Sequence, residues 1–464
     1  MKRNKKIGVL GLSLISINAI LGLKNIPFAA TIGPSAVSFW ILAALLYFIP
    51  ISLIVAELST AFPEQGGISA WVERAFGKKA AFLCGWFFWV ANFTYYPSLL
   101  IGITVNVSYA INAPQIISNT WFTTIVSLVI FWSLTILTLR GTQVSGKMSA
   151  IGAPIGVLVP AILIFGFGLA SLITGHPSAT PFTAETIAPR NLSMDSVMFL
   201  STLMFAFSGI EMIGTIAKDV HNPQRTFPKT ILIASIAIGI IYILATAAFQ
   251  FVIKITPDDT ATALYQFADV IGQQFHLPFN LAQILGICFV IAILGSLTFL
   301  ILNPSIMMAE SGKGILPEKL IKANKNDMPA NLILWQAAGV SVILISSGFI
   351  PSVSQALNML VLMATLAFFI PYVFLLLAYI KLRKSEKTAI RPFKIKKDFW
   401  AYLTAAVGLF SVIGTIVLTL IPASGTTLAE YTPMIIGPAV FALLGLWFYS
   451  RGKKKQESSL KKAG

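Results

Sequence analysis

One lysine lies in the middle of a stretch that otherwise suits a membrane helix. Residues 18–27 place Gly22, Lys24 and Pro27 within six residues of an apolar segment. A lysine at mid-membrane depth costs about 3 kcal/mol, proline lacks a helical N–H donor, and glycine adds backbone freedom. Irregular backbone at that depth survives only where protein or water covers it. The pattern predicts a helix interrupted beside a polar cavity, where a fixed cation can bind an anionic group of a solute. The alternative is a kinked helix in which Lys24 pairs with a carboxylate.

A second apolar segment contains a similar interruption. Residues 205–214 combine glycines with a single ionisable residue, Glu211, just after the pair Ser208 and Gly209. Because burial favours the neutral form of a carboxylate, Glu211 is a candidate for proton exchange. Paired interruptions at equivalent positions of two halves indicate a transporter with its site at the membrane midplane. Alternatively, Glu211 and Lys24 form one buried salt bridge that locks the two segments together, and the two interpretations can coexist.

Composition excludes a soluble globular protein. Of the 464 residues, 56% are hydrophobic and only 11% are charged, whereas about 25% charged residues is usual for soluble domains. Both cysteines, Cys84 and Cys288, lie in apolar segments and indicate small core residues rather than a disulfide. The three histidines, His176, His221 and His276, lie far apart near expected loops. We therefore expect no metal site and no cofactor.

Twelve segments are long and apolar enough to cross a membrane, since a spanning helix needs about 20 apolar residues. They are residues 7–33, 37–61, 79–111, 120–139, 148–174, 194–216, 229–254, 279–309, 330–349, 353–380, 399–421 and 431–450. This predicts an all-α membrane protein with both ends on one side. The basic start followed by an apolar run imitates a signal peptide, but the run continues to about Ile32, which argues against cleavage.

The 33 basic residues are distributed unevenly between the connections. Only Arg190 and Lys254 fall on the side opposite to the termini, and Lys24 lies within the membrane. Because cytoplasmic loops are enriched in Lys and Arg, we expect a cell-membrane protein with both termini in the cytoplasm. The net charge of +16 then reflects topology and not a nucleic-acid partner. The basic tail 451–464 is expected to be a solvated anchor, and residues 260–274 of the longest outer connection predict a short surface helix.

Three connections on the basic side carry sequence motifs. They read ELSTAFPEQGGISAW at 57–71, SGIE at 208–211 with KDVHNPQRTFP at 218–228, and NPS at 303–305 with AESGKGILP at 309–317. In this order and spacing they resemble the amino acid–polyamine–organocation (APC) permeases over spans one to ten. Lys24-Asn25-Ile26-Pro27 and the third motif most resemble the glutamate/GABA antiporter branch, which contains exchangers of an amino acid for its decarboxylated product.

The resemblance implies a single transport domain over residues 1–464. Within it, two inverted five-helix repeats at 7–174 and 194–380 would be followed by two additional helices at 399–450. A substrate would lie between the broken spans one and six, flanked by spans three, eight and ten. Free N–H groups of a half-helix can bind an α-carboxylate there, and half-helix carbonyls can accept from an α-ammonium.

Matching the family motif residue by residue implies a set of substrate contacts. The expected substrate-binding residues are Ile20, Leu21, Gly22, Lys24, Asn25, Asn92, Phe205, Ser208, Gly209, Thr298 and Phe299. Many members have glycine–serine–glycine at the break of span one, and this chain keeps only Gly22, so the usual carboxylate cradle is narrowed. Glu211 is the residue expected to couple protons.

Several of these residues have a structural alternative. Phe205 matches an aromatic lid but could be ordinary core packing. Asn92 matches a polar residue of span three but could form an interhelical hydrogen bond, worth about 0.6 kcal/mol. Thr298 and Phe299 follow a Gly-Ser pair and are expected to line the cavity. Glu57 is expected to order the inner loops rather than to bind substrate.

These features predict a secondary active amino acid transporter that works by alternating access, as an exchanger of an amino acid for its amine. Lys24 favours a substrate with an extra carboxylate, or a neutral one if Glu211 neutralises it, so glutamate-like and large neutral amino acids both remain. A proton-coupled symporter is the alternative, and a nutrient sensor on a transporter fold is a weaker one. A membrane enzyme would need a nucleophile–base or metal constellation, and no His or Cys/His group within the spans supplies one. A channel would need a repeated filter or a charged ring, and one chain with two asymmetric broken spans argues against that. The expected partners are the small-molecule substrate and the bilayer, with monomer or homodimer left open.

Overall fold

The computed structural model describes residues 6–63, 67–188, 194–256, 259–350, 353–421 and 428–463. Over these residues the secondary structure is helical, apart from turns, loops and one isolated parallel bridge between Ile7 and Val220. The fold class expected from the sequence is therefore confirmed at the level of an all-helical protein. The bridge is extended by a hydrogen bond of 2.9 Å from the His221 N–H to the Ile7 carbonyl.

The first part of the chain forms helices up to residue 187. These are α1 (Val9–Ile20), α2 (Asn25–Ala30), η1 (Gly33–Ser35), α3 (Ala36–Ala43), η2 (Ala44–Phe48), α4 (Ile49–Ala61), α5 (Ile68–Phe76), α6 (Lys78–Ala110), η3 (Pro114–Ser118), α7 (Thr120–Thr138), α8 (Thr142–Gly152), η4 (Ala153–Leu158), α9 (Val159–Ile173) and α10 (Ala184–Ile187). η1 to α4 run on as one rod, as do α8, η4 and α9, because η2 and η4 are π-helical turns inside longer helices.

The second part of the chain begins with two short helices, α11 and η5, as the first part begins with α1 and α2. Its elements are α11 (Met194–Ala206), η5 (Ile210–Asp219), α12 (Pro223–Val252), α13 (Ala263–Gln274), α14 (Leu281–Ser311), α15 (Glu318–Ile321), α16 (Ala330–Ser347), α17 (Val353–Ser385), α18 (Asp398–Thr419) and α19 (Leu428–Ala463). The expected surface helix is confirmed as α13. Helix α5 was not expected, and α19 continues as a helix well beyond residue 450.

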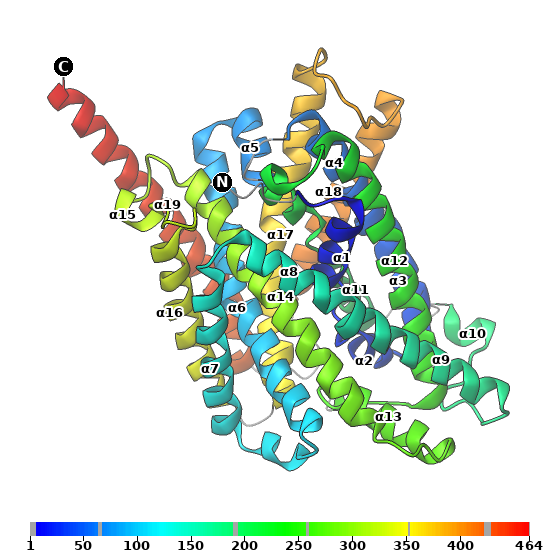
Figure 1. Cartoon of the computed structure of the whole chain (residues 1–464). Coiled ribbons are helices and arrows are strands. Elements are labelled where there is room, and N and C mark those ends of the chain that lie inside the picture. Colours follow the sequence, from blue (N-terminus) through cyan, green and yellow to red (C-terminus); the bar gives the residue numbers. More distant parts are fainter. Residues whose placement is uncertain are drawn as a thin grey trace.

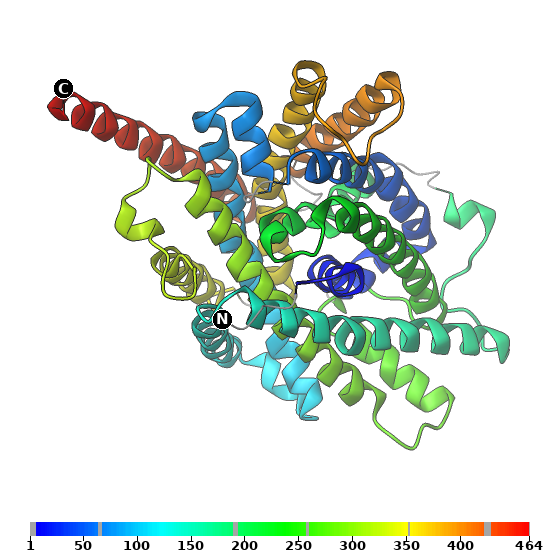
Figure 2. The same cartoon turned by 45° about the horizontal axis from the view of Figure 1, so that its top comes forward.

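The first two helices occupy the interior of the bundle. Figure 1 shows α1 and α2 behind the rod of α8 and α9, with α13 and α10 at the lower end and α5 and α15 at the upper end. In the turned view, the dark blue first helix is surrounded by later helices of the chain (Figure 2). Helix α1 contacts α8, α12 and α14. The broken segment thus lies where a buried site can be enclosed from several sides.

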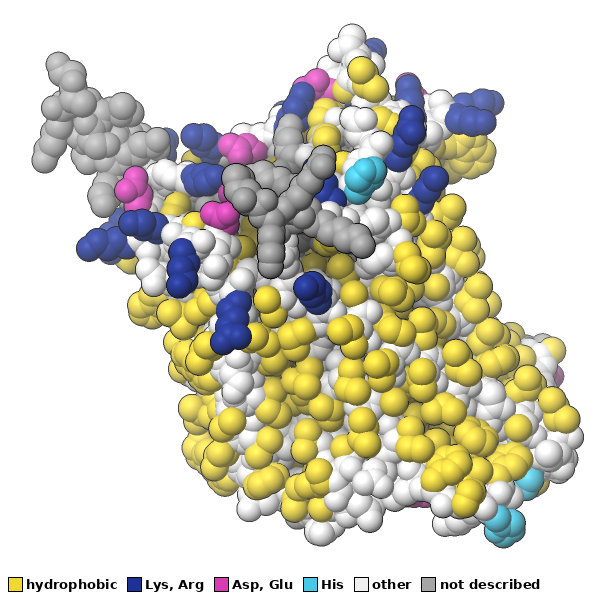
Figure 3. All heavy atoms as spheres, in the orientation of Figure 1, with side chains coloured by type: hydrophobic (Ala, Val, Ile, Leu, Met, Phe, Trp, Pro, Cys, Tyr) yellow, Lys and Arg dark blue, Asp and Glu magenta, His cyan; other side chains and the backbone are white. Residues whose placement is uncertain are grey.

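Within the described residues, eight helices are long and apolar enough to cross a membrane. They are Gly33–Ala61, Thr120–Thr138, Thr142–Ile173, Pro223–Val252, Leu281–Ser311, Ala330–Ser347, Met359–Ser385 and Asp398–Thr419, and two shorter apolar helices are Val9–Ile20 and Phe199–Gly214. On the face drawn in Figure 3, lysine and arginine side chains gather at the upper end, and a broad hydrophobic surface lies below them. This distribution is typical of a protein that spans a bilayer several times.

Glycines allow close packing between the helices that enclose the interior. A Cβ atom on Gly156 of η4 would lie 2.4 Å from the Ala292 nitrogen of α14, and one on Gly168 of α9 would lie 2.5 Å from the Ala248 carbonyl oxygen of α12. Such distances are too short for any larger residue. Small residues are favoured at membrane helix interfaces because they let two backbones approach. These contacts fix the helices that flank α1.

Glu57 at the end of α4 connects the inner loops, as expected from the sequence. Its side chain is fully buried and accepts hydrogen bonds from Arg383 Nη1 at 2.6 and 2.7 Å and from Arg391 Nη1 at 3.1 Å. The Tyr379 hydroxyl and the Ile395 N–H each donate to it at 3.0 Å. One carboxylate therefore joins α4, the end of α17 and the loop that leads to α18.

Candidate functional site

The first apolar segment is divided into two helices, α1 and α2, and the interruption lies where the sequence predicts it. Helix α1 ends at Ile20, Leu21 is extended with φ −75° and ψ 92°, and α2 begins at Asn25. Pro27 lies in the first turn of α2, where a missing N–H costs nothing because no intrahelical acceptor exists for it. Gly22 lies between the two helices. The prediction of a broken span at residues 20–27 is confirmed.

The second pair is interrupted in the same way. Helix α11 ends at Ala206, residues 207–209 form a turn, and η5 begins at Ile210. Gly209 has φ +119°, a conformation that side chains with a Cβ rarely adopt. The Ser208 N–H still donates to the Phe205 carbonyl at 2.9 Å, so the backbone leaves the helix only at the glycine.

One tyrosine hydroxyl joins the two interruptions. Tyr242 of α12 is fully buried, and its hydroxyl accepts from the Gly22 N–H at 3.0 Å and from Asn25 Nδ2 at 2.9 Å. The same hydroxyl lies 3.3 Å from the carbonyl oxygens of Ile20 and Ala206, the last residues of α1 and α11. With one proton it can donate to only one of these carbonyls at a time. Sequence reasoning missed this residue.

An aromatic group holds that tyrosine in place. Trp40 of α3 stacks on Tyr242 with ring centroids 4.2 Å apart and planes 7° apart, and its indole N–H donates to Thr246 at 3.0 Å. Phe207, in the second interruption, meets Tyr242 edge-on at 5.4 Å and stacks on Phe48 at 4.5 Å. Such aromatic pairs contribute about 0.5–1.5 kcal/mol beyond their buried area. The hydroxyl position is therefore fixed by rigid neighbours.

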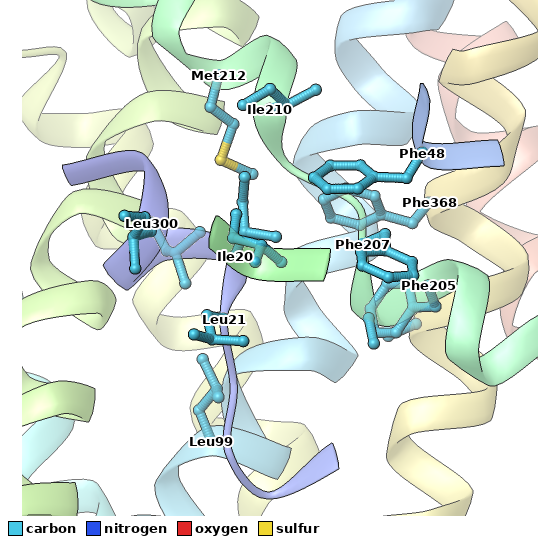
Figure 4. Packing of buried hydrophobic residues seen from close by; sticks show 14 of the residues in the cluster. Ile20, Leu21, Phe48, Leu99, Phe205, Phe207, Ile210, Met212, Leu300 and Phe368 are labelled. Carbon is cyan, nitrogen blue, oxygen red and sulfur yellow. The ribbon is translucent and has the colours of Figure 1, made fainter. Parts of the chain in front are cut away.

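Three cavities meet at Lys24. The first is bounded by the first interruption, by α6 and by α14. The second lies between the two interruptions and reaches Phe205 and Phe368. The third extends toward α13 at the end of the bundle opposite to α5. Figure 4 shows Ile20 and Leu21 on one side of this region and the phenylalanines on the other.

The Lys24 ammonium contacts one helix face and no acid among the described residues. Nζ donates to the Ser98 hydroxyl at 3.3 Å and lies 5.4 Å from the centre of the Tyr95 ring, both on α6. Glu211 is buried elsewhere: its Oε2 accepts from the Gly209 N–H at 3.2 Å, and its Oε1 has no hydrogen-bond partner. The salt bridge between Lys24 and Glu211 that the sequence left open is therefore not formed in this structure.

The expected site residues fall into two groups. Ile20, Leu21, Gly22 and Lys24 line the first cavity, and Ile20, Lys24, Asn25, Phe205 and Ser208 line the second. Gly209 lies behind Ser208, where its N–H donates to the Tyr372 hydroxyl at 3.0 Å. Ser208 itself is hydrogen-bonded to the Tyr47 hydroxyl at 2.8 Å.

Besides Gly209, three expected substrate-binding residues lie outside these cavities. Asn92 is fully buried in α6, where its amide donates to the Phe88 carbonyl at 2.7 Å. Thr298 and Phe299 are buried in α14 and line none of the three cavities, whereas Ser296 and Leu300 of the same helix do.

A face of α6 supplies cavity residues that the sequence reasoning missed. Tyr95, Leu99, Gly102 and Asn106 line one or more of the cavities. Their spacing of three and four residues places them along one side of a helix. Asn92 lies on the same face one turn earlier, before the cavity begins. The spacing of three and four residues within an apolar span is the sequence feature from which this cavity-lining face could have been predicted.

No group of three or more His, Cys, Asp or Glu side chains suited to a metal ion occurs in the described ranges. The polar groups that face the cavities are an ammonium, amides and hydroxyls. They can bind and orient a small charged solute.

Comparisons with known proteins identify the family of the chain. Residues 7–444 match the family described as amino acid permease. An uncharacterized transporter from Legionella pneumophila is 30% identical over 98% of this chain and 99% of its own. A glutamate/gamma-aminobutyrate antiporter from Lactococcus lactis is 26% identical over 73% of this chain and 68% of its own.

A solved structure shows the same fold. The crystal structure of a manganese transporter from Eremococcus coleocola superposes with a TM-score of 0.61 over 97% of this chain and 95% of that chain, at 12% identity. At that identity the likeness concerns the fold alone. The matches of family, relatives and fold confirm the resemblance seen in the motifs: the chain belongs to the amino acid permease family of membrane transporters.

Proposed function

We propose that this protein exchanges an amino acid for its decarboxylated amine by alternating access, with the solute bound between the two helix interruptions. The observation that carries the proposal is Lys24, a cation that lines three neighbouring cavities and has no described carboxylate partner. A fixed charge that no described residue neutralises is available for a solute. The similarity to a protein named a glutamate/gamma-aminobutyrate antiporter supports exchange as the mode.

The proposed site combines the cation with an aromatic wall. Phe205 lies edge-on to Tyr95 at 5.4 Å and to Phe368 at 5.6 Å, so three rings from three helices line one side. An apolar or aliphatic solute body can pack there, while its charged groups face Lys24 and Asn25. This supports glutamate-like and large neutral amino acids alike. Asn92, Thr298 and Phe299 are not part of the proposed contacts in this conformation.

We also propose twelve spans in a cell membrane, with both termini in the cytoplasm. The two interrupted pairs, the eight apolar rods, and helices α6 and α19, of 33 and 36 residues, would together supply them. The repeats would be residues 7–174 and 194–380, followed by 399–450. The orientation is supported by the basic side chains at one end of the molecule in Figure 3, since positive charge is enriched on the cytoplasmic side.

Counterflow in proteoliposomes tests the exchange. Purified protein is reconstituted with a candidate amine inside, and uptake of labelled glutamate or tyrosine is followed, with γ-aminobutyrate or tyramine as the internal solute. We expect internal amine to raise the initial rate of uptake of the matching amino acid several-fold over empty liposomes. Uptake that is indifferent to any internal solute would contradict exchange and favour a symporter.

A proton-coupled symporter is the second candidate, and one buried acid favours it. Glu211 has a carboxylate oxygen without a partner, and the titratable side chains around it are Tyr47, Cys84 and Tyr372. If protons bind there during transport, Glu211→Gln should abolish the difference between uptake at pH 5 and at pH 7. The matched control is Glu310→Gln, because Glu310 is paired with Lys313 near the surface and should leave the pH difference unchanged. A pH response that persists in Glu211→Gln would exclude Glu211 as the coupling group.

A further inference from the structure

Backbone N–H groups at a broken helix are expected to bind a carboxylate. In this protein the glycine N–H at the first break already donates a hydrogen bond to a side chain of the protein. The Gly22 N–H donates to the Tyr242 hydroxyl at 3.0 Å. The Leu21 N–H bonds back to Ile17, and the Asn25 and Ile26 N–H groups bond to the Gly22 and Leu23 carbonyls at 2.9 and 3.0 Å. Helix α2 is only six residues long, so its dipole adds little.

The second break is satisfied internally as well. The Gly209 N–H donates to Glu211 Oε2 at 3.2 Å and to the Tyr372 hydroxyl at 3.0 Å. A carboxylate of the protein thus already lies at the start of η5, where a substrate carboxylate would otherwise bind. A second negative group there would be repelled by the first. Neither break therefore presents its glycine N–H to a solute.

The Lys24 ammonium is the charged donor at the first break. Its side chain borders all three cavities and makes one hydrogen bond, to the Ser98 hydroxyl. The Ser98 hydroxyl donates its own hydrogen bond to the Tyr95 carbonyl at 2.7 Å, so it can only accept the hydrogen bond from Lys24. An ammonium has three N–H donors, which leaves two for a ligand.

We propose that the α-carboxylate of the transported amino acid is bound by the Lys24 side chain and not by the glycine N–H groups of the breaks, with Tyr242 as the positioning residue that occupies the first of those groups. The assignment rests on the proposed function. It names the substrate class as amino acids recognised through a carboxylate by a side-chain cation. It also accounts for the presence of a single glycine, Gly22, at the first break, where many family members have two.

Tyr242 and Lys24 have separable roles in this arrangement. Tyr242→Phe keeps the ring that stacks on Trp40 and removes only the hydroxyl. It frees the Gly22 N–H and leaves Lys24 untouched, so affinity for a carboxylate should be maintained or increased. Lys24→Gln keeps a polar side chain, shorter by one bond, and removes the charge, so affinity for a carboxylate should fall. Lys24→Arg restores the charge and should restore part of that affinity.

The experiment is equilibrium binding to purified full-length protein. The probes are two pairs that differ by the α-carboxylate alone: glutamate with γ-aminobutyrate, and tyrosine with tyramine. For the pair that binds, we expect Lys24→Gln to weaken the amino acid about tenfold or more, since a hydrogen bond to a charged group is lost. The amine should change by less than about threefold, which also shows that the variant is folded. Tyr242→Phe should keep the ratio of the two affinities within about threefold of wild type.

The outcomes separate this assignment from the proposed function. If Lys24→Gln weakens the amino acid and the amine equally, or weakens neither, the assignment to Lys24 is overturned while exchange stands. A loss of amino acid binding in Tyr242→Phe, with Lys24→Gln unaffected, would likewise overturn it in favour of the backbone break. If the wild-type protein binds none of the four compounds, the proposed exchange of these amino acids fails, and the assignment fails with it.

Discussion

Replacement of Glu57 by alanine is expected to destabilise the folded protein by about 3–5 kcal/mol. The Glu57 carboxylate is fully buried between Arg383 and Arg391, whose side chains are 2% and 4% exposed. Removing one partner from a buried ion pair leaves the other charge in a medium that cannot solvate it. Asp398 stays with Arg383 at 2.7 Å, but Arg391 loses its described carboxylate. The measurement is the thermal or denaturant midpoint of the purified protein in detergent.

The matched control for Glu57 is Glu386→Gln. Glu386 pairs with Arg74 at 3.3 Å, and both side chains are more than one-third exposed. An exposed ion pair contributes about 0–1 kcal/mol, so this variant should unfold close to wild type. A Glu57→Ala protein that is as stable as Glu386→Gln would mean that the buried cluster does not hold α4 to the loop before α18.

Gly209→Ala is expected to lower the initial rate of transport at least about fivefold, the equivalent of about 1 kcal/mol. The backbone at Gly209 has φ +119°, and a Cβ there would also lie 3.3 Å from Ile20 Cγ1 at the end of α1. Relief of that strain requires the turn between α11 and η5 to move. Because the same turn positions Ser208 and Glu211, the site changes with it. Initial rates of counterflow, normalised to the amount of protein in the liposomes, measure the effect.

The control for this variant is Gly239→Ala in α12. Gly239 is in a helix, and nothing lies within 4 Å of the position its Cβ would take. Alanine is favoured over glycine in a helix by about 1 kcal/mol, so transport and stability should equal or slightly exceed wild type. If Gly209→Ala transports as fast as Gly239→Ala, the turn at 207–209 tolerates a side chain, and the conformation of Gly209 is not required to position the site.

The two interruptions were predictable because their cause is local. A proline at position 27 cannot donate within a helix, and a glycine at position 209 can adopt a backbone angle that other residues avoid. Each of these is a property of a single residue in an apolar run. The bounds of the spans followed from hydropathy for the same reason, and several helices end within two or three residues of the expected position.

The partners of the interrupted segments were not predictable, because they depend on packing between distant segments. Nothing in an apolar helix marks Tyr242 as the residue whose hydroxyl reaches Gly22, 220 positions away. The direction of the Lys24 side chain, toward Ser98 of α6 and not toward Glu211, depends on how segments far apart in the sequence pack together. Thr298 and Phe299 were expected in the cavity because of their place in the span, whereas Ser296 and Leu300 of the same helix line it instead.

The central claim is that a transported solute binds in the cavities between the two interruptions. Leu99 of α6 lines two of the three cavities that meet at Lys24, and Gln273 of α13 is exposed. We would introduce one cysteine at either position into a protein in which Cys84 and Cys288 are replaced by alanine. The rate of modification by a small water-soluble thiol reagent is then measured with and without the solute identified by counterflow.

We expect the solute to slow modification of Leu99→Cys several-fold, at concentrations that saturate transport, and to leave Gln273→Cys unaffected. Equal rates at Leu99→Cys with and without a solute that the same protein transports would contradict binding between the two interruptions.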